Sequence, residues 1–164
     1  MSFPRRAIIA VTSATAPLHD GNPTGLFISE ALHPFQVLKE AGFEVDLVSE
    51  EGTYVPDWLS QQEDFLNGAD KEQWEDMNGE FRKKLDNMPN VHSIDGKNVR
   101  LLPCAVQPVK WSRMTWLTFA CMFYQYRLFF ASAGHAALID YPHAGGLQAI
   151  ATEIWTQGGV IAAV

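Results

Sequence analysis

Glu30 is the first candidate for acid–base chemistry in this sequence, because it stands among apolar residues in the stretch LFISEAL. Apolar surroundings raise the pKa of a carboxyl group toward the range in which it exchanges protons at neutral pH. The structural alternative is a glutamate in the first turn of a helix, held there by the helix dipole and a capping hydrogen bond. On position alone, we favour the structural alternative for Glu30.

Gly134 and His135 form a second candidate, because they follow an apolar run that is typical of a strand. A glycine at such a turn permits close approach of the backbone, and its exposed N–H groups can meet an oxyanion. A glycine that only closes the turn, followed by a surface histidine, explains the same pattern equally well.

A metal site and a reactive thiol are less well supported. Glu30 and His33 have the i, i+3 spacing that places two ligands on one helical face, but Pro34 is adjacent and no third ligand is evident. Neither Cys104 nor Cys121 is flanked by a strand-to-helix elbow or a paired base. We therefore expect no metal and no nucleophile from these residues.

Composition bounds the class of protein. The 164 residues are 47% hydrophobic and 19% charged, which suits one compact domain over residues 1–164. A net charge of −7 disfavours binding to nucleic acid, and no apolar run has the length needed to cross a bilayer. Two cysteines make no disulfide framework, so we expect a reducing, cytoplasmic location.

The first fifty residues predict a strand, a helix and a second strand. The run RAIIAVTSA predicts a central parallel strand, and FEVDLVSE predicts a strand nearer the sheet edge. Between them, residues 26–42 show an apolar stripe at helical spacing, in which Val37 widens the stripe. Gly42 stands where a helix ends in a left-handed residue, and Pro34 requires the regular helix to begin shortly before it.

The last forty residues repeat this order. RLFFASAGH predicts a strand and a turn, and Asp140 to Pro142 predict a turn and helix entry. LQAIATEIWTQGG predicts a helix whose apolar residues include Trp155, and residues 158–164 predict a buried strand. Two such units predict an α/β fold with a parallel sheet and helices on both faces, and ligands of such folds bind beyond the carboxyl ends of the strands.

Two segments depart from this order. Residues 55–92 are polar, acidic and helical in preference, so we expect short surface helices that form a cap-like insertion. Residues 99–125 hold both cysteines and show neither the strand nor the helix period, which makes them an atypical insertion.

Two long blocks of the sequence resemble the DJ-1/PfpI superfamily and, within it, the fungal Hsp31-like glutathione-independent glyoxalases. These blocks are residues 24–52 and residues 128–164. The resemblance implies a flavodoxin-like fold, often dimeric, that converts methylglyoxal to D-lactate without cofactor or metal. It also implies that Glu30 is the family's catalytic glutamate and that Gly134 and His135 line the substrate pocket.

The same resemblance implies a cysteine and a histidine directly after the strand at residues 158–164. The sequence stops at Val164, so we expect a truncated, inactive chain with an incomplete sheet. Deleting residues 99–125 restores the continuous form of the family, and the codons able to encode its ends resemble splice signals, so we interpret the segment as a retained intron. The alternatives to an enzyme are a non-enzymatic, chaperone-like stress protein and a non-functional fragment.

Overall fold

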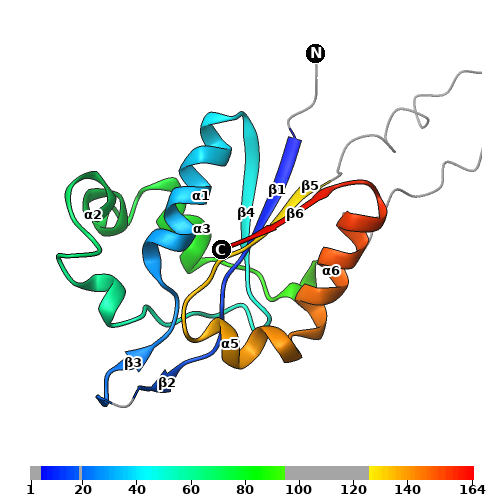
Figure 1. Ribbon diagram of the computed structural model, residues 1–164. Coiled ribbons are helices and arrows are strands. Elements are labelled where there is room, and N and C mark those ends of the chain that lie inside the picture. Colours follow the sequence, from blue (N-terminus) through cyan, green and yellow to red (C-terminus); the bar gives the residue numbers. More distant parts are fainter. Residues whose placement is uncertain (1–4, 19, 95–125) are drawn as a thin grey trace, which may run out of the picture.

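A parallel sheet of four strands forms the centre of the molecule. The computed structural model describes residues 5–18, 20–94 and 126–164 (Figure 1). The strands lie across the sheet in the order β4 (Phe43–Val48), β1 (Arg5–Ala10), β5 (Tyr126–Ala131) and β6 (Val160–Ala163). All three neighbouring pairs are parallel. In chain order this is second, first, third, fourth, which is the flavodoxin-like order, so the predicted α/β class is confirmed.

Helices cover both faces of this sheet and bury two separate hydrophobic clusters. On one face lie α1 (Ile28–Glu40) and α3 (Glu80–Asp86), and on the other lies α6 (Gly145–Thr156). Side chains alternate between the faces along each strand, so β1 gives Ile9 to the α1 cluster and Ile8 to the α6 cluster. The sheet is therefore the middle of three layers.

Helix α1 begins earlier than Pro34 suggests. Its first residue is Ile28, and Pro34 lies inside the helix, where it has no N–H to donate to the carbonyl four residues before it. Leu32, Phe35 and Leu38 are buried as expected. Val37 is 62% exposed, so its predicted place on the apolar stripe is wrong, because α1 contacts the sheet along a narrower stripe than the sequence suggests.

The connection from α1 into β4 agrees with the sequence. Gly42 has φ +80°, the left-handed conformation expected after the helix C-terminus. β4 lies at the edge of the described sheet, as its alternation of apolar and acidic residues indicates.

The 55–92 segment contains four short helices: η1 (Leu59–Gln61), α2 (Gly68–Glu75), α3 and η2 (Val91–Ser93). They differ in how they are held. α3 gives Phe81 and Leu85 to the core beneath α1, whereas α2 buries no residue. A two-stranded ribbon, β2 (Ala16–Pro17) with β3 (Pro23–Thr24), precedes α1.

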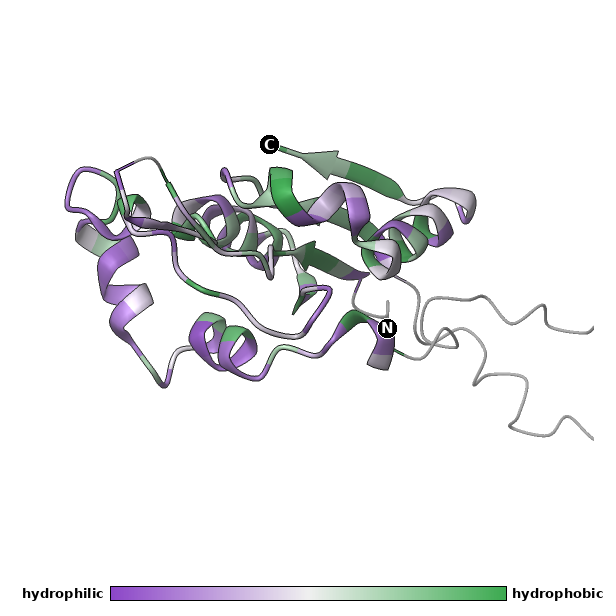
Figure 2. Cartoon of the chain, turned by 90° about the horizontal axis from the view of Figure 1, so that it is seen from below, coloured by the Kyte–Doolittle hydropathy of each residue, from purple (hydrophilic) through white to green (hydrophobic). Residues whose placement is uncertain are grey.

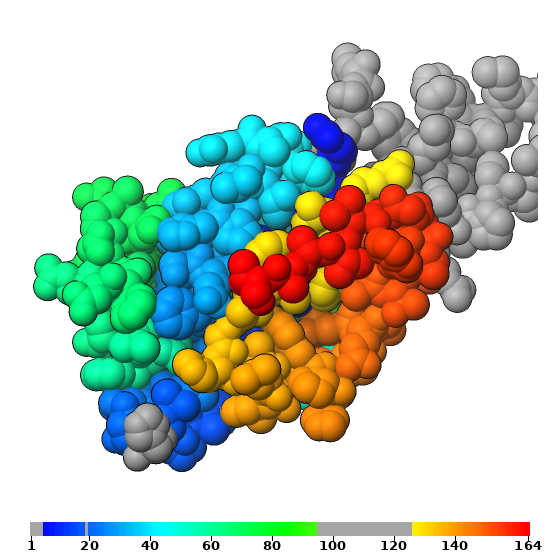
Figure 3. Space-filling model, in the orientation of Figure 1, coloured from blue at the N-terminus to red at the C-terminus, as the bar shows by residue number. Residues whose placement is uncertain are grey.

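The C-terminal unit brings two corrections. Trp155 is 65% exposed, because α6 turns only Leu147, Ile150 and Ile154 toward the sheet. The strand predicted as buried is also exposed: in the described part of the chain β6 pairs with β5 alone, and Val160 is 55% exposed. Figure 3 shows β6 on the surface between α1 and α6, and Figure 2 shows that this strand is hydrophobic.

The chain between β5 and η2 includes the predicted insertion at residues 99–125, which lies outside the described residues. Among the described helices, none combines the length and hydrophobicity of a membrane-spanning segment.

Candidate active site

A cavity of about 430 Å³ lies between α1 and the strands β5 and β6. Its walls are mostly apolar, and Glu30 supplies their carboxylate. The lining residues are Ser29, Glu30, His33, Pro34, Val37, Leu38, Leu128, Phe130 and Val164. Glu30 therefore shares one cavity with the residue that follows β6, at the carboxyl edge of the sheet where α/β folds bind ligands.

The Glu30 carboxylate is partly buried, which is unusual for a glutamate in a helical first turn. Its Oε2 atom is buried and has no hydrogen-bond partner among the described residues. Burial raises the pKa of Glu30 above its ordinary value, His135 opposes this by attracting the charged form, and Asp57 adds to the rise. Glu30 does lie in the first turn of α1, as the structural alternative expects, but the N-cap residue Phe27 makes no side-chain capping hydrogen bond.

The turn of Gly134 and His135 packs against the segment that leads into α1. Gly134 has φ +118°, and a Cβ atom at this position would lie 3.3 Å from the carbonyl oxygen of Gly25. His135 is exposed, and it interacts electrostatically with Glu30. Gly134 therefore lies close to the segment before α1, but neither Gly134 nor His135 is among the residues that line the cavity of Glu30.

Asp57 holds the approach to α1 from the other side. Only 2% of this residue is exposed. Its Oδ2 atom accepts hydrogen bonds from Thr24 Oγ1 at 2.8 Å and from the Gly25 N–H at 3.3 Å. Its Oδ1 atom accepts from the N–H groups of Leu59 at 2.8 Å and Ser60 at 3.2 Å. One carboxylate therefore joins β3 to η1.

Two further carboxylates bind backbone N–H groups from distant parts of the chain. Asp140, at the end of α5 (Ala137–Asp140), accepts hydrogen bonds from Ser13 at 2.8 Å and Ala14 at 3.3 Å. It thereby fixes the exit of β1 and is more than the turn residue that the sequence predicts. Glu50 accepts hydrogen bonds from the first turn of α6, at Gly146 and Leu147, where the helix dipole favours an acid.

His33 has a partner other than Glu30. Its Nε2 atom lies 2.7 Å from Asp70 Oδ2 on α2. No group of three potential metal ligands occurs in the described ranges. Of the i, i+3 pair weighed as metal ligands, His33 therefore contacts Asp70, whereas Glu30 Oε2 has no hydrogen-bond partner among the described residues.

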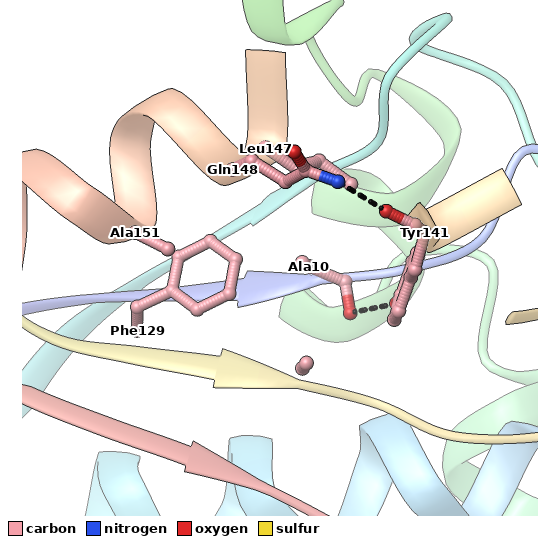
Figure 4. A pocket seen from close by; sticks show the side chains of 7 residues that line it. Ala10, Phe129, Tyr141, Leu147, Gln148 and Ala151 are labelled. Carbon is pink, nitrogen blue, oxygen red and sulfur yellow. Dashed lines mark hydrogen bonds between the residues drawn. The ribbon is translucent and has the colours of Figure 1, made fainter. Parts of the chain in front are cut away.

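A smaller pocket of about 110 Å³ lies on the opposite face, between β5 and α6 (Figure 4). Its polar groups are paired: the Tyr141 hydroxyl donates to the Ala10 carbonyl at 2.9 Å, and the Gln148 amide donates to the Tyr141 carbonyl at 2.8 Å. Burial is the main reason that the pKa of Tyr141 is raised. This pocket offers a ligand only apolar contacts and hydrogen-bonding groups that are already in use.

Comparison with known proteins finds relatives with closely related names. The chain is 38% identical to Glyoxalase 3 of Candida albicans, over 97% of this chain and 56% of that relative. It is 37% identical to Glutathione-independent glyoxalase HSP31 of Saccharomyces cerevisiae, over 98% of this chain and 57% of that relative. The crystal structure of glyoxalase III from Candida albicans superimposes with a TM-score of 0.78 at 38% identity, over 97% of this chain and 56% of that one. Over nearly its whole length, the chain is therefore similar to Hsp31-like glutathione-independent glyoxalases.

The chain spans a little more than half the length of these curated relatives. No protein-family model matches it. The X-ray structure of Francisella tularensis Rapid Encystment Protein 24 KDa, at 20% identity and a TM-score of 0.67 over 97% of this chain and 57% of that one, supports the fold alone.

Sequence reasoning proposed Glu30, Gly134 and His135 as site residues and missed the carboxylates that bind backbone N–H groups of distant segments. Asp57 and Asp140 each lie in a short loop-like stretch, which gives no sign of a buried carboxylate. A partial signal exists at Asp57, because a Pro-Asp pair favours a turn in which the aspartate binds backbone N–H groups.

Proposed function

We propose that this chain provides the proton-transfer group and substrate cavity of a glutathione-independent glyoxalase that converts methylglyoxal to D-lactate. The single observation that carries the proposal is Glu30, whose Oε2 atom is buried without a partner among the described residues and which lines the same cavity as Val164. Homology to glutathione-independent glyoxalases supports the reaction class.

The reaction needs a nucleophile, a base and donors for a developing negative charge. A thiolate adds to the aldehyde carbon and forms a hemithioacetal. A base then removes the hydrogen of that carbon and returns the proton to the neighbouring carbon through an enediol, which gives a lactoyl thioester. Water hydrolyses the thioester to D-lactate and regenerates the thiol, so the sum is methylglyoxal plus water to D-lactate.

Glu30 suits the role of the base. Its raised pKa brings it closer to neutral pH, which makes the carboxylate a stronger base than an ordinary glutamate. The walls of the cavity are mostly apolar, and the backbone N–H groups at Gly134 and His135 are the proposed donors to the enediol oxygen.

The thiol of the proposed site is the one that the family resemblance implies directly after β6. None of the cavity-lining residues is a cysteine, and the two cysteines of the sequence, Cys104 and Cys121, lie outside the described residues. The Val164 N–H donates to the Ala131 carbonyl at 3.4 Å, which continues the pairing of β6 with β5 up to a residue that lines the cavity.

The test compares two polypeptides. One is residues 1–164, and the other joins Val164 to the segment that follows the corresponding strand in the Candida albicans relative. After circular dichroism and a cooperative melt establish folding, D-lactate is measured with methylglyoxal as substrate. We expect turnover by the joined protein and none by residues 1–164 above a Glu30→Ala control.

A folded but inactive joined protein would overturn the proposal, as would D-lactate production by residues 1–164 well above the control. Suppression of client aggregation without aldehyde turnover would favour the chaperone-like alternative.

A further inference from the structure

Asp57 is not among the residues that line the cavity, and its hydrogen bonds join the segment that leads into α1 to η1. Four hydrogen bonds converge on its carboxylate, two from β3 and Gly25 and two from the start of η1. Charged hydrogen bonds of this kind are shorter and stronger than neutral ones. The carboxylate is fully used, so its function lies in what it holds in place.

We propose that Asp57 is a positioning residue: it fixes the Glu30 carboxylate relative to the Gly134 turn. This inference rests on the proposed function, in which Glu30 moves the proton.

The first step is the close fit of two backbone segments. The Leu26 N–H donates to the Val55 carbonyl at 2.7 Å, and the Asp57 N–H donates to the Leu26 carbonyl at 2.8 Å. A Cβ atom at Gly25 would lie 2.0 Å from the Val55 carbonyl oxygen, so only glycine permits this approach. Asp57 therefore closes a junction that has no room to shift.

The second step is the distance along the chain from this junction to the site. Gly25 and Phe27 are the residues against which the Gly134 turn packs. The Glu30 N–H donates to the Phe27 carbonyl at 3.1 Å, which ties the glutamate to the same short segment. A displacement of residues 24–27 therefore moves the base and the proposed oxyanion donors relative to each other.

The third step is charge. Three titratable groups interact electrostatically with Glu30: Asp57 from the loop before η1, His135 from the turn after β5, and Tyr141 from η4 (Tyr141–His143). His33, on α1, lines the same cavity as Glu30. The Asp57 charge raises the pKa of Glu30, and the His135 charge lowers it. Removal of the Asp57 charge should therefore lower the pKa of Glu30, an effect that loss of packing alone would not produce.

The test uses Asp57→Asn, with the exposed Asp64→Asn as a matched loss of one negative charge. The pKa of Glu30 is measured by carbon-detected NMR titration in the 164-residue chain. We expect Asp57→Asn to lower it, as removal of a like charge does, and Asp64→Asn to leave it unchanged. An unchanged Glu30 pKa in folded Asp57→Asn would overturn the inference.

Thr24→Val separates geometry from charge, because it removes one hydrogen bond to Asp57 and leaves the carboxylate in place. In the joined protein we expect kcat to fall about tenfold with KM changed by less than about threefold, since misplacement of a proton-transfer group affects the chemical step. An unchanged kcat in Thr24→Val would overturn the inference. This measurement decides the inference even if Asp57→Asn does not fold.

The two proposals fail in different ways. If the joined protein makes no D-lactate, the proposed function fails, whereas the NMR titration still decides whether Asp57 controls Glu30.

Discussion

The two pockets of this protein lie on opposite faces of the same strand. β5 turns Leu128 and Phe130 to the larger cavity beside α1, and Phe129 and Ala131 to the smaller pocket beside α6. Both pockets are lined mainly by apolar atoms. They differ in their polar groups: the carboxylate oxygen on the α1 side is unpartnered, whereas the hydroxyl and amide on the α6 side are engaged.

This difference teaches how to tell a site from a packing defect. A buried polar atom without a partner costs stability, so its persistence needs a reason. A pocket whose polar atoms are all paired needs no such reason. By this criterion the α1 cavity is the stronger candidate site, and its larger volume is a secondary argument.

The largest expected contrast concerns activity. In the joined protein, Glu30→Gln should lower kcat by about a hundredfold to ten-thousandfold, the usual contribution of a positioned base. Gln148→Ala, its counterpart in the α6 pocket, should change kcat by less than about twofold, because its amide only bridges backbone carbonyls. Initial rates of D-lactate formation measure both, and equal losses would remove the distinction between the pockets.

The second contrast concerns stability. Leu147→Ala should lower the free energy of unfolding by about 2–4 kcal/mol, because it removes a buried side chain beside an existing void. Urea denaturation measures the change, and the exposed Leu138→Ala is the control, expected to cost less than about 0.5 kcal/mol. A loss below 1 kcal/mol for Leu147→Ala would mean that the α6 face can collapse around the gap.

A smaller effect is expected at Tyr141. Tyr141→Phe removes one hydrogen bond to the Ala10 carbonyl and should destabilise the fold by about 1 kcal/mol. The carbonyl keeps two other donors, the N–H and the hydroxyl of Ser132, so it is not left unpaired. D-lactate formation should stay within about threefold of the unchanged protein, and a larger loss would assign Tyr141 to the site.

The smallest effect is the pH dependence of stability. The pKa of Glu30 is raised in the folded state, so the stability linked to its protonated form is present below the ordinary pKa of 4.5 and is lost as pH rises through the folded-state value. Glu30→Gln should therefore gain stability relative to the unchanged protein as pH increases from about 4 to 7, by a few tenths of a kcal/mol, since water screens part of the carboxylate. Thermal melts of both proteins across this range measure the gain, and a constant difference would contradict the raised pKa.

The sequence predicts what depends on local pattern. Apolar runs placed the parallel strands, and glycines with left-handed φ marked the turns at Gly42 and Gly134. Hydrophobicity alone overstated burial at Val37 and Trp155, because a helix packed on a sheet buries one stripe and leaves other apolar residues in water. The role of Glu30 came from family resemblance, since position alone favoured a capping residue.

The carboxylates that organise the site could not be predicted from the sequence. Asp140 bonds to residues 127 and 126 positions away, and Glu50 to residues 96 and 97 positions away. In sequence these acids are indistinguishable from the solvated acids around them. Only the folded chain reveals which ones meet an unpaired backbone N–H group.

Helix α2 is the segment that we expect to detach most easily from the rest of the described fold. It buries no residue, and its contacts with α1 include the polar pairs of Asp70 with His33 and Gln36 and of Gln73 with Gln36. A segment held in this way detaches with much less free energy than the global transition requires. Its amides should therefore exchange with deuterium long before those of β1, and a protease should cleave it while the sheet remains intact.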